Sequence, residues 1–311
     1  MVSDVALGTM TWGRDTDEHE AREQFEVYLD AGGVFVDTAD VYADGAAQEI
    51  LGHLLHDHRD DDIVVLSRSG GSRNAARPFE LSRRHLMHSL ESTLRRLGVD
   101  AVDIWSIHGP DDGTHVDETC AAMSDALQSG KALYTSVCDW SPANLGYATG
   151  RGCAVSGGAP TVAQYEYSLL QRGVEDDVVP FLTSHGLGLV AWSPLGRGVL
   201  TGKYRRGTPA DSRGATSHLR AFVEPYLDLR SRQIVDAVCA AAEGLAVAPL
   251  DIALAWVLAR PAVSSAIVGA RTAAQLRGIL AGHGLELPAE IVRALDDVSH
   301  QPTSYPSSTA W

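Results

Sequence analysis

Residues 64–72 read VVLSRSGGS, an apolar run that ends in a cation and a group of small residues. Val64, Val65 and Leu66 are typical of a strand too apolar to face water, and Arg68 stands where we expect the chain to leave that strand. Strands that are apolar throughout, rather than at every second residue, favour a parallel sheet covered on both faces. A cation at the end of such a strand raises the question of what it contacts.

The same pattern recurs along the whole chain. Eight short apolar segments are predicted to be strands, at residues 6–9, 34–37, 63–67, 102–107, 132–137, 161–164, 188–192 and 265–268. Segments with helical spacing lie between them, such as 17–31, 48–58, 82–97, 116–129, 175–185 and 230–244. Eight such units predict a closed (β/α)8 TIM barrel, a single domain over residues 1–311, with a doubly wound sheet as the competing architecture. Residues 193–228 and the C-terminal tail 300–311 are predicted to be irregular, the tail being either frayed or folded across the mouth of the barrel.

Composition limits the classes of function. The chain has 311 residues, 45% of them hydrophobic, and a formal net charge of -15, which opposes binding to nucleic acid or to an anionic membrane surface. No apolar run approaches the roughly 20 residues that cross a bilayer, and the N-terminus has no leader pattern. Four scattered cysteines without a CxxC pair indicate neither a disulfide framework nor a zinc site. These features predict a cytoplasmic protein whose partner is a small molecule; they leave its oligomeric state open.

Polar residues gather at the predicted strand ends. In a barrel of this kind the carboxyl ends of the strands form the active site. An Asp at one strand end is by itself more often a helix cap or turn residue. Six such residues on successive strands predict a common site instead: Asp37, Arg68, His108, Asp139, Gln164 and Ser193.

Tyr42 follows Asp37 closely enough to turn into the same site. A tyrosine ordinarily titrates near 10, so it needs a neighbouring cation to act as an acid, and Arg68 is expected to lower its pKa. Asp37 is expected to hold Arg68 by a two-pronged contact, and His108 to offer a hydrogen-bond donor that orients a carbonyl oxygen. These residues predict proton delivery to a carbonyl. They include neither an activated nucleophile nor metal-ligand spacing, so the electrons must come from elsewhere.

Several stretches resemble, in order, the motifs of the aldo-keto reductase superfamily: LGTMTWG, DTADVYADGAAQEILG, SRRHLMHSLESTLRRLGVDAVDIWSIHGPD, GKALYTSVCDWSP, QYEYSLLQR, AWSPLGRGVLTGKY and IALAWVLARPAVSSAIVGARTAAQL. The resemblance implies a barrel that uses NADPH without a Rossmann domain, and a tyrosine that delivers the proton with support from an aspartate, a lysine and a histidine. The matching catalytic positions are Tyr42, Asp37, Arg68 and His108. Arg68 departs from the family pattern TKxG, which has lysine there, and the replacement is not conservative.

The resemblance also implies a set of cofactor contacts. Trp192 would stack on the nicotinamide, although barrel packing is the alternative, and Gln164 would bind the carboxamide. The loop after the seventh strand would close over the pyrophosphate, unless it is merely a solvated loop, through Ser193, Leu195, Gly196, Arg197, Gly198 and Lys203. The adenosine end would contact Gly269, Arg271 and Gln275, with Arg271 on the 2'-phosphate. Trp12 would form a wall of the substrate pocket, or else pack in the core.

Two further departures concern cofactor contacts. Cys138 and Asp139 stand where the family has a Ser-Asn pair that holds the carboxamide, and Ile279 replaces an asparagine that contacts adenine. An ionised aspartate only accepts hydrogen bonds, so the paired contact of an amide is lost.

Three functions therefore remain open. The leading hypothesis is NADPH-dependent reduction of a small-molecule aldehyde or ketone with Tyr42 as proton donor. The second is a non-redox lyase, isomerase or cyclase that uses the same site. The third is a cofactor-binding regulatory protein.

Overall fold

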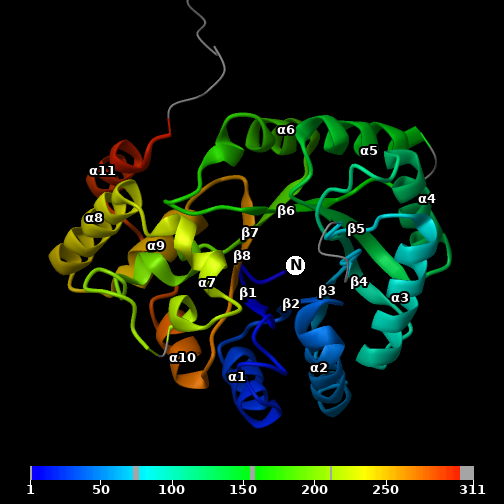
Figure 1. Cartoon of the computed structure of the whole chain (residues 1–311), viewed down its shortest axis with the longest axis horizontal. Helices are drawn as coiled ribbons and strands as arrows, with labels where there is room; N and C mark the ends of the chain where they lie inside the picture. Colours follow the sequence, from blue (N-terminus) through cyan, green and yellow to red (C-terminus); the bar gives the residue numbers. More distant parts are fainter. Residues whose placement is uncertain (1, 73–76, 155–157, 211, 302–311) are drawn as a thin grey trace, which may run out of the picture.

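The computed structural model describes residues 2–72, 77–154, 158–210 and 212–301. Its centre is a closed barrel of eight strands, each parallel to its neighbours in chain order (Figure 1). The strands are β1 (Val5–Gly8), β2 (Phe35–Ala39), β3 (Val64–Ser69), β4 (Val102–Ile107), β5 (Ala132–Cys138), β6 (Val162–Glu166), β7 (Gly188–Trp192) and β8 (Val263–Val268). The predicted barrel is confirmed, and the doubly wound alternative is wrong. Most of the predicted tail lies outside the described residues.

Helices surround the barrel and cover its outer face (Figure 1). The main helices are α1 (Glu18–Asp30), α2 (Ala46–Asp57), α3 (Arg83–Leu97), α4 (Val116–Gln128), α5 (Pro142–Ala154), α6 (Val178–His185), α8 (Leu229–Leu245), α9 (Pro249–Leu258), α10 (Ala273–Ala281) and α11 (Ala289–Ser299). Side-chain caps define several of their starts: Asp17 accepts from the Glu20 N–H, and Asp228 from the Ser231 N–H. The predicted irregular segment after β7 contains the short helix α7 (Arg220–Val223) and the 3-10 turns η3 (Gly196–Thr201), η4 (Arg213–Ala215) and η5 (Glu224–Tyr226).

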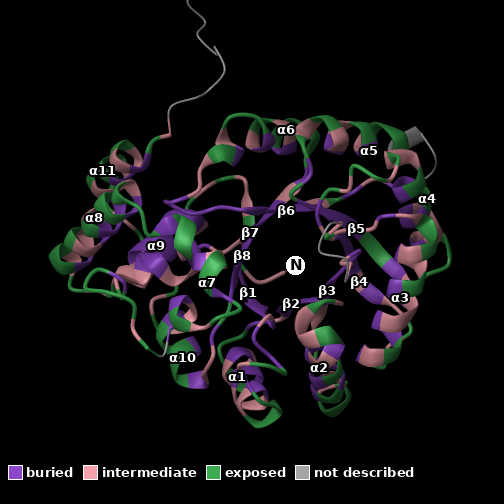
Figure 2. Ribbon diagram, in the orientation of Figure 1, coloured by how far each residue is buried: buried purple, intermediate pink, exposed green. Residues whose placement is uncertain are grey.

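The core has two layers, which explains why strands such as VVL are apolar throughout. Inside the barrel, Ala6, Phe35, Leu66, Ile104, Val190 and Ile267 pack together. Outward-facing strand residues such as Val65 join a larger cluster with the helices. In Figure 2 the strands are accordingly mostly buried, while most helices alternate buried and exposed faces.

Strand register places the polar residues at one end of the barrel. Asp37 pairs with Leu66, and Ala39 pairs with Arg68, so both strands continue beyond the predicted ends. Arg68 therefore lies inside β3, one residue before its end, rather than at the point where the chain leaves the strand. Asp37 and Gln164 likewise lie in the middle of β2 and β6. The polar side chains sit within the upper wall of the barrel instead of on loops above it.

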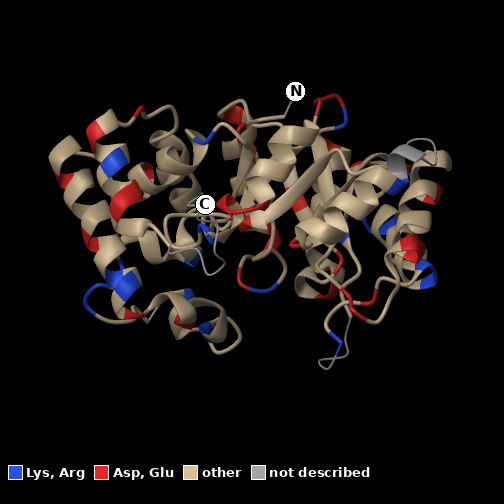
Figure 3. Ribbon diagram, turned by 90° about the horizontal axis from the view of Figure 1, so that it is seen from above, with Lys and Arg blue, Asp and Glu red and all other residues tan. Residues whose placement is uncertain are grey.

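Charged residues lie mainly on the helical layer, where acidic and basic side chains are interspersed (Figure 3). Among the described residues, no single helix has the length and apolar character to cross a membrane. The pair α8 and α9 satisfies both criteria only when joined, and it is bent by 101°.

Candidate active site

A cavity of about 580 Å³ opens at the carboxyl ends of the strands. Its wall includes most of the residues that the sequence predicts: Asp37, Tyr42, Arg68, His108, Cys138, Asp139, Trp192, Ser193, Leu195, Arg197, Gly198, Lys203, Gly269, Arg271 and Gln275. Gln164, Gly196 and Trp12 do not line it. The barrel thus brings together residues from six strands and from the loop after β7.

Arg68 connects two of the predicted catalytic residues, Asp37 and Tyr42. Its Nη2 donates to Asp37 Oδ2 at 2.7 Å and also to the hydroxyl oxygen of Tyr42. The guanidinium lies 5.1 Å from the centroid of the Tyr42 ring. The Asp37 and Arg68 side chains are almost completely buried, at 2% and 7% exposure. An arginine can be buried here because it is paired with a carboxylate.

The contact between Asp37 and Arg68 is single, not the two-pronged contact that the sequence predicts. The second oxygen of Asp37, Oδ1, accepts from Gln164 Nε2 at 2.8 Å. Gln164 is fully buried. Arg68 Nε is buried and has no hydrogen-bond partner among the described residues. Gln164 therefore orients Asp37 in this structure, whereas the resemblance implies a contact with the cofactor.

The ionisation of Tyr42 is set by two opposing effects. Burial raises its pKa, the positive charge of Arg68 lowers it, and the net result is a pKa of about 12. The expected fall in pKa is thus wrong as a net result, because the desolvation of the phenolate outweighs the cation. Burial would lower the pKa of Arg68, but the charges of Asp37 and Tyr42 raise it above the usual value. Tyr42 is consequently a protonated phenol, hydrogen-bonded to a permanent cation.

His108 follows β4 and lines the cavity beside Arg68. Its ring lies 5.4 Å from that of Phe79, and its Nδ1 is buried without a partner among the described residues. Burial, and next the charge of Arg68, lower the pKa of His108 from 6.5 to about 3. His108 is therefore a neutral imidazole, suited to hydrogen bonding with a ligand rather than to carrying charge.

This neutral imidazole predicts an acid-sensitive contribution to stability. Between about pH 3 and 6.5 the unfolded chain binds more protons at this position than the folded one, so stability falls as pH drops through 6.5. At pH 5 the contribution lost is about 2 kcal/mol, from about 1.36 kcal/mol per pH unit. We expect His108→Gln to show a correspondingly smaller loss between pH 7 and 5 in urea titrations. His19→Gln, at a side chain that is 84% exposed, is the control and is expected to match the unsubstituted protein. Equal losses in all three proteins would contradict a buried neutral His108.

Cys138 and Asp139 close one side of the cavity. Asp139 has a positive φ of 54°. Its Oδ1 accepts from Trp192 Nε1 at 3.1 Å, and the Cys138 thiol donates to its Oδ2 at 3.4 Å. Burial raises the pKa of Cys138 well above its usual value, so the thiol remains protonated. The pair is thus a carboxylate held between an indole N–H and a thiol.

Arg197 is already paired with protein groups. Its Nε and Nη2 donate to the two carboxylate oxygens of Glu166 at 2.8 and 2.6 Å, and its guanidinium lies 4.1 Å from the centroid of the Phe222 ring. Nη1 donates to the Phe222 carbonyl at 2.6 Å. The structure therefore uses Arg197 to fasten α7 to the end of β6, and not, as the resemblance implies, as a cation free for a phosphate.

One end of the cavity is cationic. Arg213, which sequence reasoning missed, lines it together with Arg271 and Lys203. Burial, and next the neighbouring charge of Arg271, lower the pKa of Arg213. Two cations whose charges repel each other would both be stabilised by an anion. Gly269 lies beside them, and a Cβ there would be 3.4 Å from Arg213 Nη2. This end of the cavity is suited to phosphate groups.

Trp12 lies in the core. It is fully buried, and its Nε1 donates to Gln24 Oε1 at 3.1 Å. The structure thus supports the packing alternative for Trp12. Apolar side chains that do line the cavity include Phe222, whose ring lies 6.4 Å from that of Trp192, and Phe79, beside His108.

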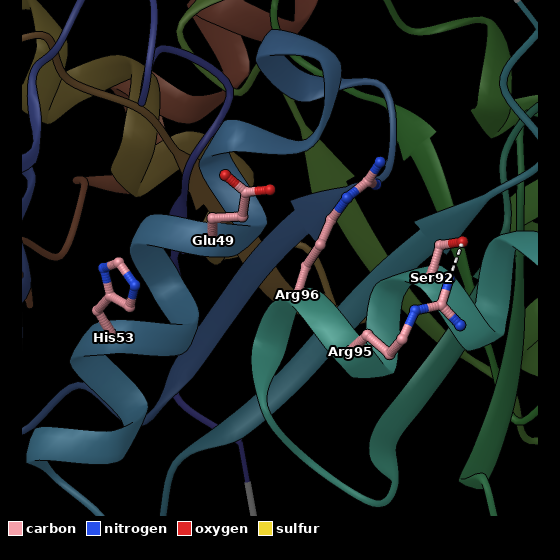
Figure 4. A pocket seen from close by; sticks show the side chains of 5 residues that line it. All are labelled: Glu49, His53, Ser92, Arg95 and Arg96. Atoms are coloured by element: carbon pink, nitrogen blue, oxygen red, sulfur yellow. Dashed lines mark hydrogen bonds between the residues drawn. The ribbon is translucent and has the colours of Figure 1, made fainter.

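A second hollow of about 410 Å³ lies on the outside of the molecule, between α2 and α3 (Figure 4). Glu49 and His53 face it from α2, and Ser92, Arg95 and Arg96 from α3. Arg95 Nη2 donates to Ser92 Oγ at 2.9 Å, and Arg96 Nη1 donates to Gln48 Oε1 at 3.1 Å. The first bond lies within α3, and the second joins α3 to α2. We therefore place the functional site in the barrel cavity.

Comparison with known proteins gives a consistent picture. The family model described as "Aldo/keto reductase family" matches residues 4–300. The chain is 35% identical over 288 residues to "Probable voltage-gated potassium channel subunit beta" of Arabidopsis thaliana, and the aligned region covers 89% of this chain and 86% of that protein. It is 37% identical over 281 residues to the protein of the same description from Oryza sativa subsp. japonica, spanning 86% and 84%. It is also 31% identical over 330 residues to "Uncharacterized oxidoreductase YrpG" of Bacillus subtilis, spanning 100% and 96%.

Proposed function

Because the chain belongs to the aldo/keto reductase family, a family of oxidoreductases, we propose that it reduces an aldehyde or ketone with NADPH. The observation that carries the proposal is the double contact of Arg68 Nη2 with Asp37 and with the Tyr42 hydroxyl at the wall of the cavity. A phenol fixed in this way has a defined direction for its proton.

The residues present fit a dinucleotide. Tyr42, His108 and Trp192 lie in the same cavity as the cationic group of Lys203, Arg213 and Arg271. Glycine at 269 permits close approach to the peptide backbone, and Gly198 has a φ of 89° that favours glycine. A nicotinamide bound near Trp192 would supply the hydride.

The chain's own residues would handle the proton. Tyr42 donates its proton to the carbonyl oxygen, and Arg68 stabilises the phenolate that remains, because its charge is permanent and already in contact with the phenol oxygen. Asp37, which Gln164 orients, holds the guanidinium in place. The neutral His108 orients the carbonyl oxygen before transfer. Together these groups lower the energy of a carbonyl that is gaining negative charge.

Titration of the purified protein with NADPH tests the proposal, using the fluorescence of the reduced cofactor. We expect binding, followed by oxidation of NADPH when a panel of aromatic and aliphatic aldehydes and ketones is added. Binding without oxidation would instead support a regulatory protein. If no binding is detected at millimolar NADPH, the reductase hypothesis is refuted, and the hypothesis of a non-redox enzyme is retained.

Cofactor choice gives a further prediction. Replacing Arg271 by alanine is expected to raise the Kd for NADPH by about 10- to 100-fold, because a charged hydrogen bond to phosphate is worth about 1.5–3 kcal/mol. The Kd for NADH, which lacks the 2'-phosphate, is expected to change less than about threefold on the same scale. Arg277→Ala on the exposed face of α10 is the matched control, expected to change neither value. Equal weakening of both cofactors by Arg271→Ala would contradict recognition of the 2'-phosphate by this residue.

A further inference from the structure

Asp139 places a carboxylate in the cavity beside Trp192. It immediately follows β5, and both of its oxygens are engaged, Oδ1 by the Trp192 indole and Oδ2 by the Cys138 thiol. Among the described residues it forms no salt bridge; Arg68, the nearby cation, makes its bonds to Asp37 and Tyr42. The negative charge of Asp139 is thus compensated only by neutral donors and by a cation engaged elsewhere.

The hydrogen bonds indicate which form Asp139 takes. An indole N–H can only donate, and the raised pKa of Cys138 keeps its thiol protonated. Both partners therefore offer hydrogens, which a carboxylate accepts and a carboxylic acid accepts less well. Burial raises the pKa of Asp139 above its usual value, and the bonds from Trp192 and Cys138 and the charge of Arg68 offset only part of that rise. The geometry, with one donor facing each oxygen, is that of an ionised carboxylate.

We propose that Asp139 makes this site bind the oxidised nicotinamide cofactor more tightly than the reduced one. This inference rests on the proposed function, which puts the nicotinamide next to Trp192. NADP+ and NADPH differ by one unit of charge on the nicotinamide ring, and a neighbouring carboxylate attracts the cationic ring but not the neutral one. The riboses, phosphates and adenine are chemically identical in the two forms.

The preference has a consequence for the reaction. If the site binds NADP+ about ten times more tightly than NADPH, the two-electron reduction potential of the bound NADP+/NADPH couple falls by about 30 mV. Bound NADPH thereby becomes a stronger hydride donor, and the oxidised product leaves more slowly. Asp139 would thus favour the hydride-transfer step at the cost of product release.

Asp139→Asn tests this with little disturbance of the fold. Asparagine tolerates the positive φ of 54°, and its side-chain oxygen still accepts from Trp192, so charge is the main property removed. The Kd values of NADP+ and NADPH are measured at pH 8 for both proteins by calorimetry. We expect the ratio of Kd for NADP+ to Kd for NADPH to rise about tenfold in the variant, corresponding to about 1.4 kcal/mol.

Asp15→Asn provides the matched control. Asp15 acts electrostatically on Arg213, at the phosphate end of the cavity, where the two cofactors are identical. This substitution is expected to change both affinities equally and to leave their ratio unaltered. A shift of less than about threefold for Asp139→Asn, or an equal shift in both variants, would overturn the inference while leaving the reductase intact. If neither nucleotide binds the unsubstituted protein, the proposed function itself is refuted, and the inference with it.

Discussion

Replacing Tyr42 by phenylalanine is expected to lower kcat for carbonyl reduction by about 10²–10⁴, the range that a positioned proton donor contributes. The phenol is the acid that Arg68 directly contacts in the cavity, and its pKa of about 12 keeps it protonated until a carbonyl oxygen begins to gain charge. Phenylalanine fills the same space without a proton to donate. NADPH affinity is expected to change little, because the cationic end of the cavity is untouched. Single-turnover oxidation of NADPH measures the effect.

Tyr134→Phe controls for the loss of a phenol elsewhere. Tyr134 lies in β5 with 54% of its surface exposed, far along the strand from Cys138 at its cavity end. It is expected to retain the full rate. Retention of more than a tenth of the rate in Tyr42→Phe, with folding intact by circular dichroism, would mean that another group delivers the proton.

The fold follows from local pattern to a large extent. Strands that are apolar on both faces require two packed layers, and the structure provides them by turning Leu66 inward and Val65 outward. The ends of the strands were harder to predict, because Asp37 and Arg68 are polar residues that follow apolar runs and therefore suggest that the strands end there. They remain in their strands because each has its partner in the neighbouring wall of the barrel. Pairing across strands, which no local pattern contains, thus extends the sheet.

Which residues line the cavity was predictable, because the order of the strands brings their carboxyl ends together. Which hydrogen-bond partner each residue has was not predictable, because the partners are distant in sequence. Asp37, Tyr42, Arg68 and His108 all line the predicted cavity. Gln164 is directed to Asp37 across 127 residues of sequence. Such a choice depends on which side chain lies opposite in the closed barrel.

The loop after β7 shows the same limit. Arg197 is directed to Glu166 and to the ring of Phe222, which belongs to a segment predicted to be irregular. The left-handed φ of Arg197, 58°, also turns its side chain in a way that residue type does not reveal. Residue type therefore indicated a cation in this loop but not its partner.

Removing the cation of Arg68 is expected to have the largest effect on stability. In Arg68→Met the buried carboxylate of Asp37 loses its ion pair and keeps only the hydrogen bond from Gln164. Leaving one partner of a buried ion pair uncompensated costs about 3–5 kcal/mol. Urea titration at pH 8 measures this loss as a difference in the free energy of unfolding. The double variant Arg68→Met/Asp37→Asn removes both charges and keeps an acceptor for Gln164. It is expected to recover most of the stability that Arg68→Met loses.

The loss should also depend on pH in a defined direction. Burial raises the pKa of Asp37 above 3.8, and the positive charge of Arg68 opposes this rise. Removing that charge in Arg68→Met therefore raises the pKa of Asp37 further. Above pH 3.8 the folded variant then binds more protons than the unfolded chain, and its stability falls as pH rises through the folded pKa. The deficit in the free energy of unfolding should therefore be smaller at pH 5 than at pH 8.

Arg68→Lys retains the charge and removes the unpartnered Nε; we expect it to remain folded and to raise carbonyl turnover. A pH-independent deficit, or a fall in turnover with lysine, would show that the guanidinium serves through its shape rather than its charge.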